Sequence, residues 1–282
     1  LQGGVDHYLD NPAARKDVSV AANGSSYRKD VEGVMPKIIV DYYAERKIVK
    51  NQMLAAQKKY QKNKSVELER EIVRCENRQM AIKILLNSLF GALGNKWYRY
   101  FDLRIAEGIT LTGQKVIKWC EAAVNTELNK LLNTDKDYVI AIDTDSVYVN
   151  FSGLVEKFNP KDPVQFLSKI CEDHFNPMFE RSMQDLFEQT NAYQNRMVME
   201  REVIADRGIW QAKKRYILNV YDMEGVRYSE PKLKIMGIEA VKSSTPSVCR
   251  DKIKEVLKII MQGTEHDVQD FIAAFKEEFK TL

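Results

Sequence analysis

KILLNSLFG, at residues 83–91, sets a basic, an amide and an aromatic side chain within a run that has helical periodicity. Lys83, Asn87 and Phe90 stand at positions i, i+4 and i+7, so they share one stripe of a helix. The leucines of the same run fall on other faces, and a stripe of this composition is not typical of a core. The pattern therefore predicts a helix over residues 66–89 that displays a binding surface.

A second helical pattern precedes this one, over residues 31–63, and the polar stretch at residues 60–65 lets the chain reverse between the two. Together they predict an antiparallel helical hairpin. Arg46 and Lys50 are one turn apart on the first helix, so the hairpin can present three cations, with Lys83 as the third, to one polyanion. Phosphate is the group that such a cluster favours. Each cation alone is more typical of a solvated surface.

Asp143-Thr144-Asp145-Ser146 separates two β-rich runs, residues 138–142 and 147–151, which predicts a β-hairpin. Because strand side chains alternate, we expect Asp143 and Asp145 on the same side. Two carboxylates so close repel each other, and a divalent cation removes that penalty. Oxygen ligands favour Mg²⁺ or Mn²⁺ over zinc, so the pair is a candidate metal site. The alternative is an ordinary tight turn, which Asp also favours.

A third candidate surface is the run Lys213-Lys214-Arg215, directly before an alternating strand pattern at residues 215–221. Successive side chains diverge there, so we expect at least one of these cations to reach a nucleic-acid phosphate. Such contacts position a duplex without reading its sequence. The alternative is a solvated charge run without a partner.

The remaining patterns complete a mixed α+β chain. Asn23-Gly24 predicts a hairpin turn near the start. Helices are expected over residues 106–132 and 163–190 and as a pair over residues 247–280, with one more strand over residues 197–204. We therefore expect a helical hairpin inserted in an α+β body that ends in a helical tail.

The composition of the 282 residues, with 44% hydrophobic and 29% charged, fits a globular chain of about two domains. The net charge of +3 does not by itself indicate a nucleic-acid partner. The four cysteines form no CxxC pair, which argues against a zinc site or a disulfide framework. No window approaches the roughly 20 apolar residues of a membrane span, so a cytoplasmic protein is expected. Because Leu1 leads directly into patterned sequence, we expect a piece of a longer polypeptide.

The helix motif at residues 83–95, followed downstream by Asp143-Thr144-Asp145-Ser146, resembles the family B DNA polymerases. YRYFDLR at residues 98–104, KKRY at 213–216, NVYDME at 219–224 and KIMG at 234–237 are similar to the replicative polymerases of T-even-like bacteriophages. The resemblance implies an α+β fold with an antiparallel-sheet palm and flanking helices. Its implied segments are a palm lead-in at 1–32, a fingers hairpin at 33–95, the palm at 96–238 and the start of a thumb at 239–282.

For the nucleotide, the resemblance implies in-line attack of a primer 3′-oxygen on the α-phosphorus of a dNTP. Lys83 is implied in catalysis, because cationic fingers neutralise the departing pyrophosphate. Phe90 stands where the family usually has Tyr, so a hydroxyl near the nascent base pair is missing and a change in fidelity is expected. The residues implied to hold the nucleotide are Arg46, Lys50, Lys83, Asn87 and Phe90.

For the metals, the implied cofactor is a pair of Mg²⁺ ions, with Mn²⁺ as a substitute. The resemblance implies that Asp145 binds both ions and that Asp143 supports it. Glu202, which we expect to alternate with Glu200 on a strand, is implied beside them. Lys214 is implied to meet the primer terminus. The residues implied to contact DNA are Gly91, Lys213, Lys214, Arg215 and Tyr216.

Two further departures concern completeness. The segment between Arg46 and Lys83 is shorter than in the T-even-type enzymes, which implies a smaller fingers hairpin. The family's other metal-binding aspartate lies in a motif similar to DxxSLYPS, which these residues lack. We therefore expect an incomplete metal centre and a chain that does not polymerise alone. The implied partners are primer–template DNA, dNTP and an upstream polymerase segment that carries the missing aspartate, with a sliding clamp as a further candidate and no membrane.

Two other functions fit parts of this pattern. A non-catalytic DNA-binding remnant would use the basic helix and Lys214 for duplex affinity, and its binding would persist in EDTA. A metal-dependent nuclease would use the same carboxylates, but the sequence offers no group to activate water. The polymerase interpretation places the chain in the cytoplasm of a phage-infected bacterium.

Overall fold

The computed structural model describes residues 17–280, and within them the chain divides into two compact units, residues 17–201 and 202–280. Of the predicted lead-in, residues 1–16 lie outside the described part. Helices and small antiparallel sheets confirm the α+β class. The segments predicted at 1–32, 33–95, 96–238 and 239–282 do not coincide with the two units, and as functional subdomains they stay a prediction. Within residues 17–280, no helix is long and apolar enough to cross a membrane.

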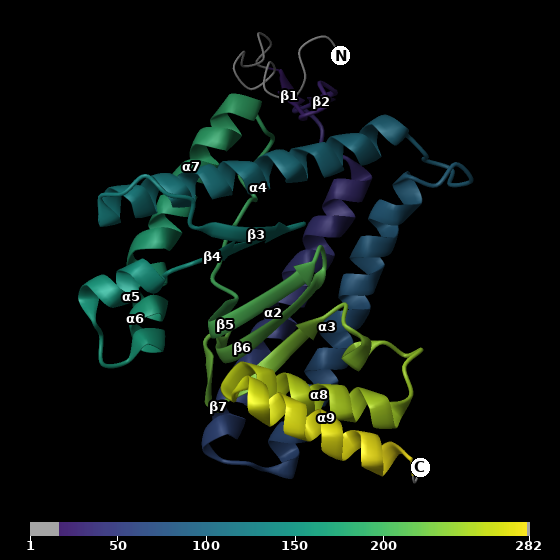
Figure 1. Cartoon of the computed structure of the whole chain (residues 1–282). Helices are drawn as coiled ribbons and strands as arrows, with labels where there is room; N and C mark the ends of the chain where they lie inside the picture. The colour runs from purple at the N-terminus through teal and green to yellow at the C-terminus, as the bar shows by residue number, and fades with distance from the viewer. Residues whose placement is uncertain (1–16, 281–282) are drawn as a thin grey trace. The chain divides into compact units, whose positions relative to one another are not determined.

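The predicted helical hairpin is confirmed: α2 (Val34–Lys62) and α3 (Val66–Leu93) lie side by side (Figure 1). The reversal takes only residues 63–65, because Ser65 caps α3 by accepting a hydrogen bond from the Leu68 amide at 3.2 Å. α3 is longer than predicted, since it continues through Gly91 to Leu93 and has Gly94 as its C-cap.

Small and apolar side chains fill the contact between these two helices. Met53 and Ala56 of α2 are buried, as are Cys75 and Ile82 of α3. Gln79 is buried among them although it is polar. A buried polar group is costly unless it is hydrogen-bonded, so the partner of Gln79 bears on the function of the hairpin.

The core of the first unit is built on α4 (Leu103–Leu132). Its buried side chains recur at every fourth residue, at Val116, Cys120, Val124 and Leu128, and so form one continuous stripe. Burial raises the pKa of Cys120 to about 11, which keeps this thiol protonated near neutral pH. All four cysteines are free thiols.

A β-hairpin packs on this stripe. It consists of β3 (Val139–Asp143) and β4 (Ser146–Val149), paired antiparallel, with Val139 opposite Val149. Both of these valines pack against the cluster that contains Leu128, and Val147 packs against the cluster that contains Val116. Apolar packing on α4 therefore fixes the position of the turn that joins β3 to β4.

Three further helices cover the other side of that cluster: α5 (Ser152–Phe158), α6 (Pro163–Ile170) and α7 (Asn176–Thr190). The single helix predicted over residues 163–190 is interrupted, because a π-helical segment, Cys171–Phe175, separates α6 from α7. Asp162 caps α6 directly before Pro163. Phe175 of the π-helical segment is buried in the core, so the extra residue in that turn serves packing.

The hairpin turn predicted at Asn23-Gly24 is confirmed by β1 (Val18–Val20) and β2 (Ser26–Arg28). Gly24 adopts φ +80°, which glycine tolerates without strain. Asn23 donates from its side chain to the Arg104 carbonyl at 2.9 Å, and the Ala22 amide donates to the Thr112 hydroxyl at 3.1 Å. The β1–β2 hairpin is thereby attached to α4.

The second unit is a three-stranded antiparallel sheet with a helical layer. Its strands are β5 (Val203–Ala212), β6 (Arg215–Met223) and β7 (Val226–Met236), with β6 central. A short 3₁₀ helix, η2 (Glu239–Val241), precedes α8 (Ser247–Gln262) and α9 (Glu265–Phe279), which confirms the predicted helix pair. The core of this unit contains Ile217, Ile238, Ala240, Leu257 and Met261.

One strand prediction in this region is wrong, and one strand has no prediction. The strand predicted over residues 197–204 begins only at Val203, and residues 197–202 belong to no strand. β7 was not predicted at all, because it carries Pro231 among charged residues and has no clear alternation. Pairing with the apolar strand β6, rather than its own sequence pattern, makes it a strand.

Candidate functional site

A hydrogen bond across the α2–α3 hairpin sets the position of its cations. Arg46 Nε donates to Gln79 Oε1 at 3.3 Å, and Gln79 lies one helical turn before Lys83 on α3. Because α2 and α3 are antiparallel, Lys50 and Lys83 lie on opposite sides of Arg46 along the hairpin, each displaced by one turn, about 6 Å. The three cations therefore form a row, here called the cationic row (Arg46, Lys50 and Lys83), rather than one point.

The ion pair next to this hydrogen bond supports the same register. Arg78 donates to Glu45 Oε1 from Nε at 3.0 Å and from Nη2 at 2.5 Å. The Arg78 side chain is 61% exposed, so the pair adds little stability. Two adjacent residues of α2 are thus paired with two adjacent residues of α3, which fixes the axial register of the two helices.

The residues of the stripe predicted on α3 are exposed. Ile82 is buried against α2, whereas Lys83 and Asn87 are exposed and Phe90 is 38% exposed. A stripe with a cation, an amide and an aromatic ring is thus available on the surface of the first unit. This confirms that it is not a core face.

The turn between β3 and β4, here called the aspartate turn (Asp143–Ser146), has a tighter geometry than the sequence predicts. Asp143 pairs with Ser146, and the Asp145 amide donates to the Asp143 carbonyl at 2.7 Å. Asp145 therefore lies in the turn and not on a strand, so the expected strand alternation does not govern its direction. The Asp145 side chain is exposed, whereas Asp143 is half-buried.

Thr144 between the two carboxylates is in a strained conformation. Its φ is +58°, which is rare for a β-branched residue, and the hydrogen bond around it closes a three-residue turn. The Thr144 hydroxyl donates to Asp143 Oδ1 at 3.0 Å. Such strain persists only where the surroundings hold it, and it is concentrated at functional sites. Here the packing of β3 and β4 on α4 holds it.

The donor set of the aspartate turn fits a hard divalent cation, because both candidate ligands are carboxylates. Within residues 17–280, however, no three His, Cys, Asp or Glu side chains gather closely enough to hold a metal ion. Glu202 belongs to the second unit and accepts a hydrogen bond from Lys234 at 2.8 Å. The prediction that Glu200 and Glu202 alternate on a strand is wrong, since both precede β5.

In the second unit, Lys213 and Lys214 form the two-residue connection between β5 and β6, here called the lysine turn. Both lysines are exposed, and Lys214 has φ +61°. Arg215, which directly follows them, has a partner within the same unit. Arg215 Nη2 donates to both carboxylate oxygens of Glu239, at 3.0 and 2.8 Å, so this guanidinium is engaged within the unit.

Tyr216 and Gly91 are the other residues predicted to contact DNA. Tyr216 is only 4% exposed, and its ring stacks on Trp210 with centroids 6.2 Å apart, so little of its surface is offered to a ligand. Gly91 is exposed on α3, and a Cβ built there would meet nothing within 4 Å. Of the second-unit residues predicted to contact DNA, Lys213 and Lys214 are therefore the most exposed.

The contacts of Glu239 predict that the stability of the second unit depends on pH. Hydrogen bonds from Lys242 and then Arg215 lower the pKa of Glu239 from 4.5 to about 2. A depressed pKa adds stability above the unfolded value of 4.5, and this stability is lost as the pH falls from 4.5 towards 2. We expect the melting temperature of the unaltered chain to fall more steeply than that of Glu239→Gln over this window. Glu230→Gln is the control and should follow the unaltered chain. If the melting temperatures of the unaltered chain and Glu239→Gln fall in parallel, the assignment to Glu239 is wrong.

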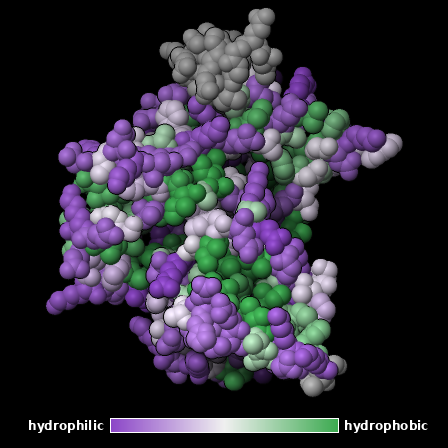
Figure 2. Space-filling view, in the orientation of Figure 1, coloured by the Kyte–Doolittle hydropathy of each residue, from purple (hydrophilic) through white to green (hydrophobic). Residues whose placement is uncertain are grey.

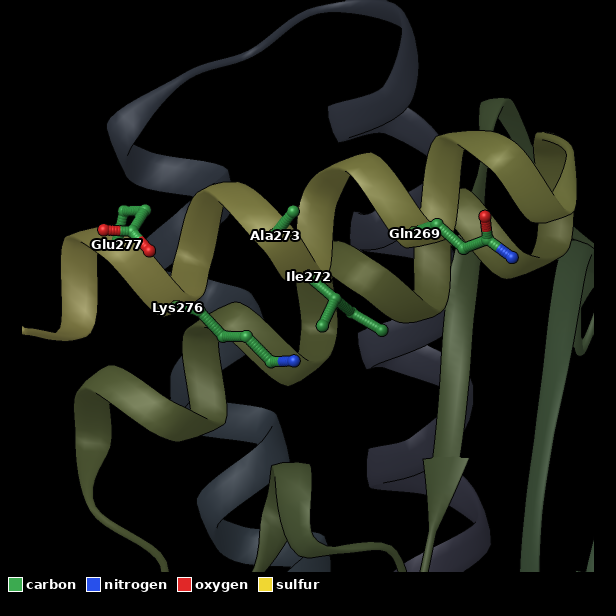
Figure 3. A pocket seen from close by; sticks show the side chains of 5 residues that line it. All are labelled: Gln269, Ile272, Ala273, Lys276 and Glu277. Carbon is green, nitrogen blue, oxygen red and sulfur yellow. The ribbon is translucent and has the colours of Figure 1, made fainter.

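Other surface features offer less chemistry. Apolar patches interrupt the hydrophilic surface, one of them over β3 and α4 (Figure 2), where Ile140 is 54% exposed. A hollow of about 390 Å³ lies on α9, and the side chains around it all come from that helix (Figure 3). They are Gln269, Ile272, Ala273, Lys276 and Glu277. This set contains no paired carboxylates and no cationic row.

Residues 5–282 match the profile of DNA polymerase family B. The chain is 34% identical to the DNA-directed DNA polymerase of Enterobacteria phage T4, over 96% of this chain and 36% of that protein. It is 36% identical to the corresponding polymerase of Escherichia phage RB69, over 88% of this chain and 34% of that protein. A DNA polymerase of Thermococcus sp. (strain 9oN-7) is 27% identical over 95% of this chain and 29% of that protein.

The match covers both units but not the relatives as a whole. The chain spans about a third of the length of the two phage proteins. The cationic row, the aspartate turn and the lysine turn all lie within the matched residues.

Proposed function

The chain belongs to family B of the DNA polymerases, and from this membership we propose that it forms part of the catalytic core of a replicative DNA-directed DNA polymerase. The reaction is template-directed transfer of a nucleotide from a dNTP to a primer 3′-hydroxyl. In this assignment residues 33–95 are the fingers, residues 96–238 the palm and residues 239–282 the start of the thumb. The chain acts together with the parts of the polymerase that its relatives contain beyond the matched region.

The observation that carries this proposal is the hydrogen bond from Arg46 to Gln79. It aligns α2 and α3 so that the cationic row lies along one hairpin of the first unit. A dNTP carries its negative charges along a chain of three phosphates, so a row of cations matches it better than a single point does. Charge-assisted hydrogen bonds to phosphate are the strong kind, which makes the row a suitable holder of the triphosphate.

The exposed stripe on α3 supplies the remaining contacts to the nucleotide. Lys83 binds phosphate and stabilises the departing pyrophosphate. Asn87, one turn further along, faces the nucleotide with an amide that can donate and accept hydrogen bonds. Phe90 offers a ring without a hydroxyl beside the nascent base pair. This stripe therefore orients the incoming nucleotide for in-line attack.

Asp143 and Asp145 hold Mg²⁺ in this proposal, and Mn²⁺ can replace it. When bound, two such ions stabilise the entering and leaving oxygens of the displacement. Asp145 is the principal ligand because its exposed carboxylate lies at the tip of the turn, and half-buried Asp143 supports it. The other aspartate of the centre comes from an upstream polymerase segment.

The lysine turn contacts the backbone of the primer–template. Lys213 and Lys214 are exposed, and their contacts to phosphate position the duplex without reading its sequence. Arg215 is engaged with Glu239, so we assign it to holding the turn rather than to binding DNA. Because the relatives include phage polymerases, we place this activity in the cytoplasm of an infected bacterium, where a sliding clamp is a further candidate partner.

The experiment that tests the proposal is a chimaera in which this chain replaces the matching third of the phage T4 polymerase. We expect Mg²⁺-dependent extension of a labelled primer, measured on a denaturing gel, and none by the same polymerase with the matching third deleted. A chimaera that binds duplex DNA equally well in EDTA but adds no nucleotide would favour a DNA-binding remnant instead. Hydrolysis of DNA in the absence of dNTP would favour a nuclease.

A further inference from the structure

The lysine turn holds a backbone conformation that lysine does not favour. At φ +61° the Lys214 Cβ crowds its own backbone, so this conformation is unfavourable for a lysine. Neither lysine of the turn is a residue type that prefers this conformation. Contacts from elsewhere in the unit must therefore hold the turn in place.

Gly237, directly after β7, lies against the backbone of this turn. A Cβ built on Gly237 would lie 2.1 Å from the Lys214 carbonyl oxygen and 3.1 Å from its carbonyl carbon. Gly237 also has φ +65°, where a side chain is strained whatever the space around it. Two independent reasons therefore require glycine at this position, and the first of them, the steric one, is the close approach to Lys214.

Glu239 adds an electrostatic contact two residues further on. Its carboxylate accepts hydrogen bonds from Arg215 Nη2, at 2.8 and 3.0 Å, and from Lys242 Nζ at 3.0 Å. Arg215 is the residue that follows the lysine turn. The segment after β7 thus contacts Lys214 of the lysine turn and Arg215, the residue directly after it.

The residues between these contacts anchor the segment in the core. Ile238 is 4% exposed and Ala240 is 1% exposed, and both pack in the cluster that contains Leu257 of α8. Residues therefore alternate between the core, at 238 and 240, and contacts to Lys214 and Arg215, made by 237 and 239. A segment anchored in this way can transmit the rigidity of the core to an exposed turn.

We infer that the segment 237–242, here called the brace, is a positioning element for DNA binding, with Gly237 and Glu239 as its positioning residues. It holds the lysine turn in the conformation that presents Lys213 and Lys214 to backbone phosphates. The inference rests on the proposed function, because it assumes that these lysines contact DNA. It adds residues that touch no DNA themselves but decide whether the lysines can.

The test measures binding of the 282-residue chain to a fluorescent primer–template duplex by anisotropy, at several salt concentrations. The slope of log affinity against log salt reports the number of phosphate contacts. We expect Lys213→Ala/Lys214→Ala to reduce this slope by about two. Gly237→Ala is expected to reduce it by one to two, although it removes no charge. When the two lysine substitutions are already present, Gly237→Ala is expected to cause no further reduction of the slope.

Gly225→Ala is the matched control. Gly225 also has positive φ, +78°, in the turn between β6 and β7 at the other end of β6. Its substitution should lower the melting temperature without changing the salt slope. If circular dichroism shows that Gly237→Ala does not fold, the double variant Arg215→Ala/Glu239→Ala decides instead. It removes the Arg215–Glu239 ion pair at constant net charge and should also reduce the salt slope.

The outcomes separate this inference from the function beneath it. The inference about the brace is overturned if the lysine variant reduces the slope but folded Gly237→Ala, or Arg215→Ala/Glu239→Ala, leaves it unchanged. In that case the proposed DNA contact of the two lysines still holds. An unchanged slope in the lysine variant, or no binding by the unaltered chain, overturns the DNA contact and the brace together.

Discussion

Asp145→Ala is expected to abolish Mg²⁺-dependent primer extension by the T4 chimaera, with a loss of about a thousandfold or more. The carboxylate of Asp145 is exposed at the tip of a turn that apolar packing holds on α4. Without it, the centre keeps Asp143 as its only proposed ligand from this chain. Metal ions contribute several kcal/mol to phosphoryl transfer, and each 1.36 kcal/mol is a factor of ten in rate. Single-turnover extension with one dNTP measures the loss directly.

Two comparisons make this result specific. Asp185→Ala removes an exposed carboxyl from α7 in the same unit and should leave the rate unchanged. Thr144→Gly relieves the positive φ between the carboxylates, so it should raise the melting temperature while slowing extension, because a looser turn holds Asp143 and Asp145 less firmly. Equal extension by Asp145→Ala and the unaltered chimaera would remove the aspartate turn from the mechanism.

The elements with strong local signals could be predicted from the sequence. The helical hairpin follows from two long periodic runs and a capping serine, and the aspartate turn follows from two short apolar strands around polar residues. β7 could not be predicted, because Pro231 and the charged residues around it hide a strand that exists by pairing with β6. Local patterns identify an element only where its own residues determine it.

The candidate site divides in the same way. Lys83 and Asn87 are visible as a motif because their spacing along one helix decides which face they share, and the two aspartates are visible because they separate two short strands. Gln79 and Gly237 carry no such signal, because each matters through a residue on another element: Arg46 for Gln79 and Lys214 for Gly237. In both cases a tertiary contact, not a periodicity, sets the position of a cation. The sequence therefore indicates the cations, but it does not indicate Gln79 and Gly237, the residues that position them.

The cationic row leads to the second large effect, which concerns nucleotide affinity. Lys83→Ala in the chimaera is expected to raise the dNTP concentration for half-maximal extension by about ten- to a hundredfold. A hydrogen bond to a charged group contributes about 1.5–3 kcal/mol, and each 1.36 kcal/mol is a factor of ten. The affinity for duplex DNA should not change, because the lysine turn lies in the other unit. Single-turnover rates at a series of dNTP concentrations measure the shift.

Lys47→Ala is the matched control for this variant. Lys47 is an exposed cation of the same hairpin, next in sequence to Arg46 but about 100° around α2 from it, so it does not belong to the cationic row. Its loss lowers the net charge of the hairpin equally and should leave the dNTP dependence nearly unchanged. If Lys83→Ala and Lys47→Ala shift the dNTP dependence by the same amount, the hairpin attracts nucleotides only through its overall charge, and the alignment of Arg46 by Gln79 has no role in holding the triphosphate.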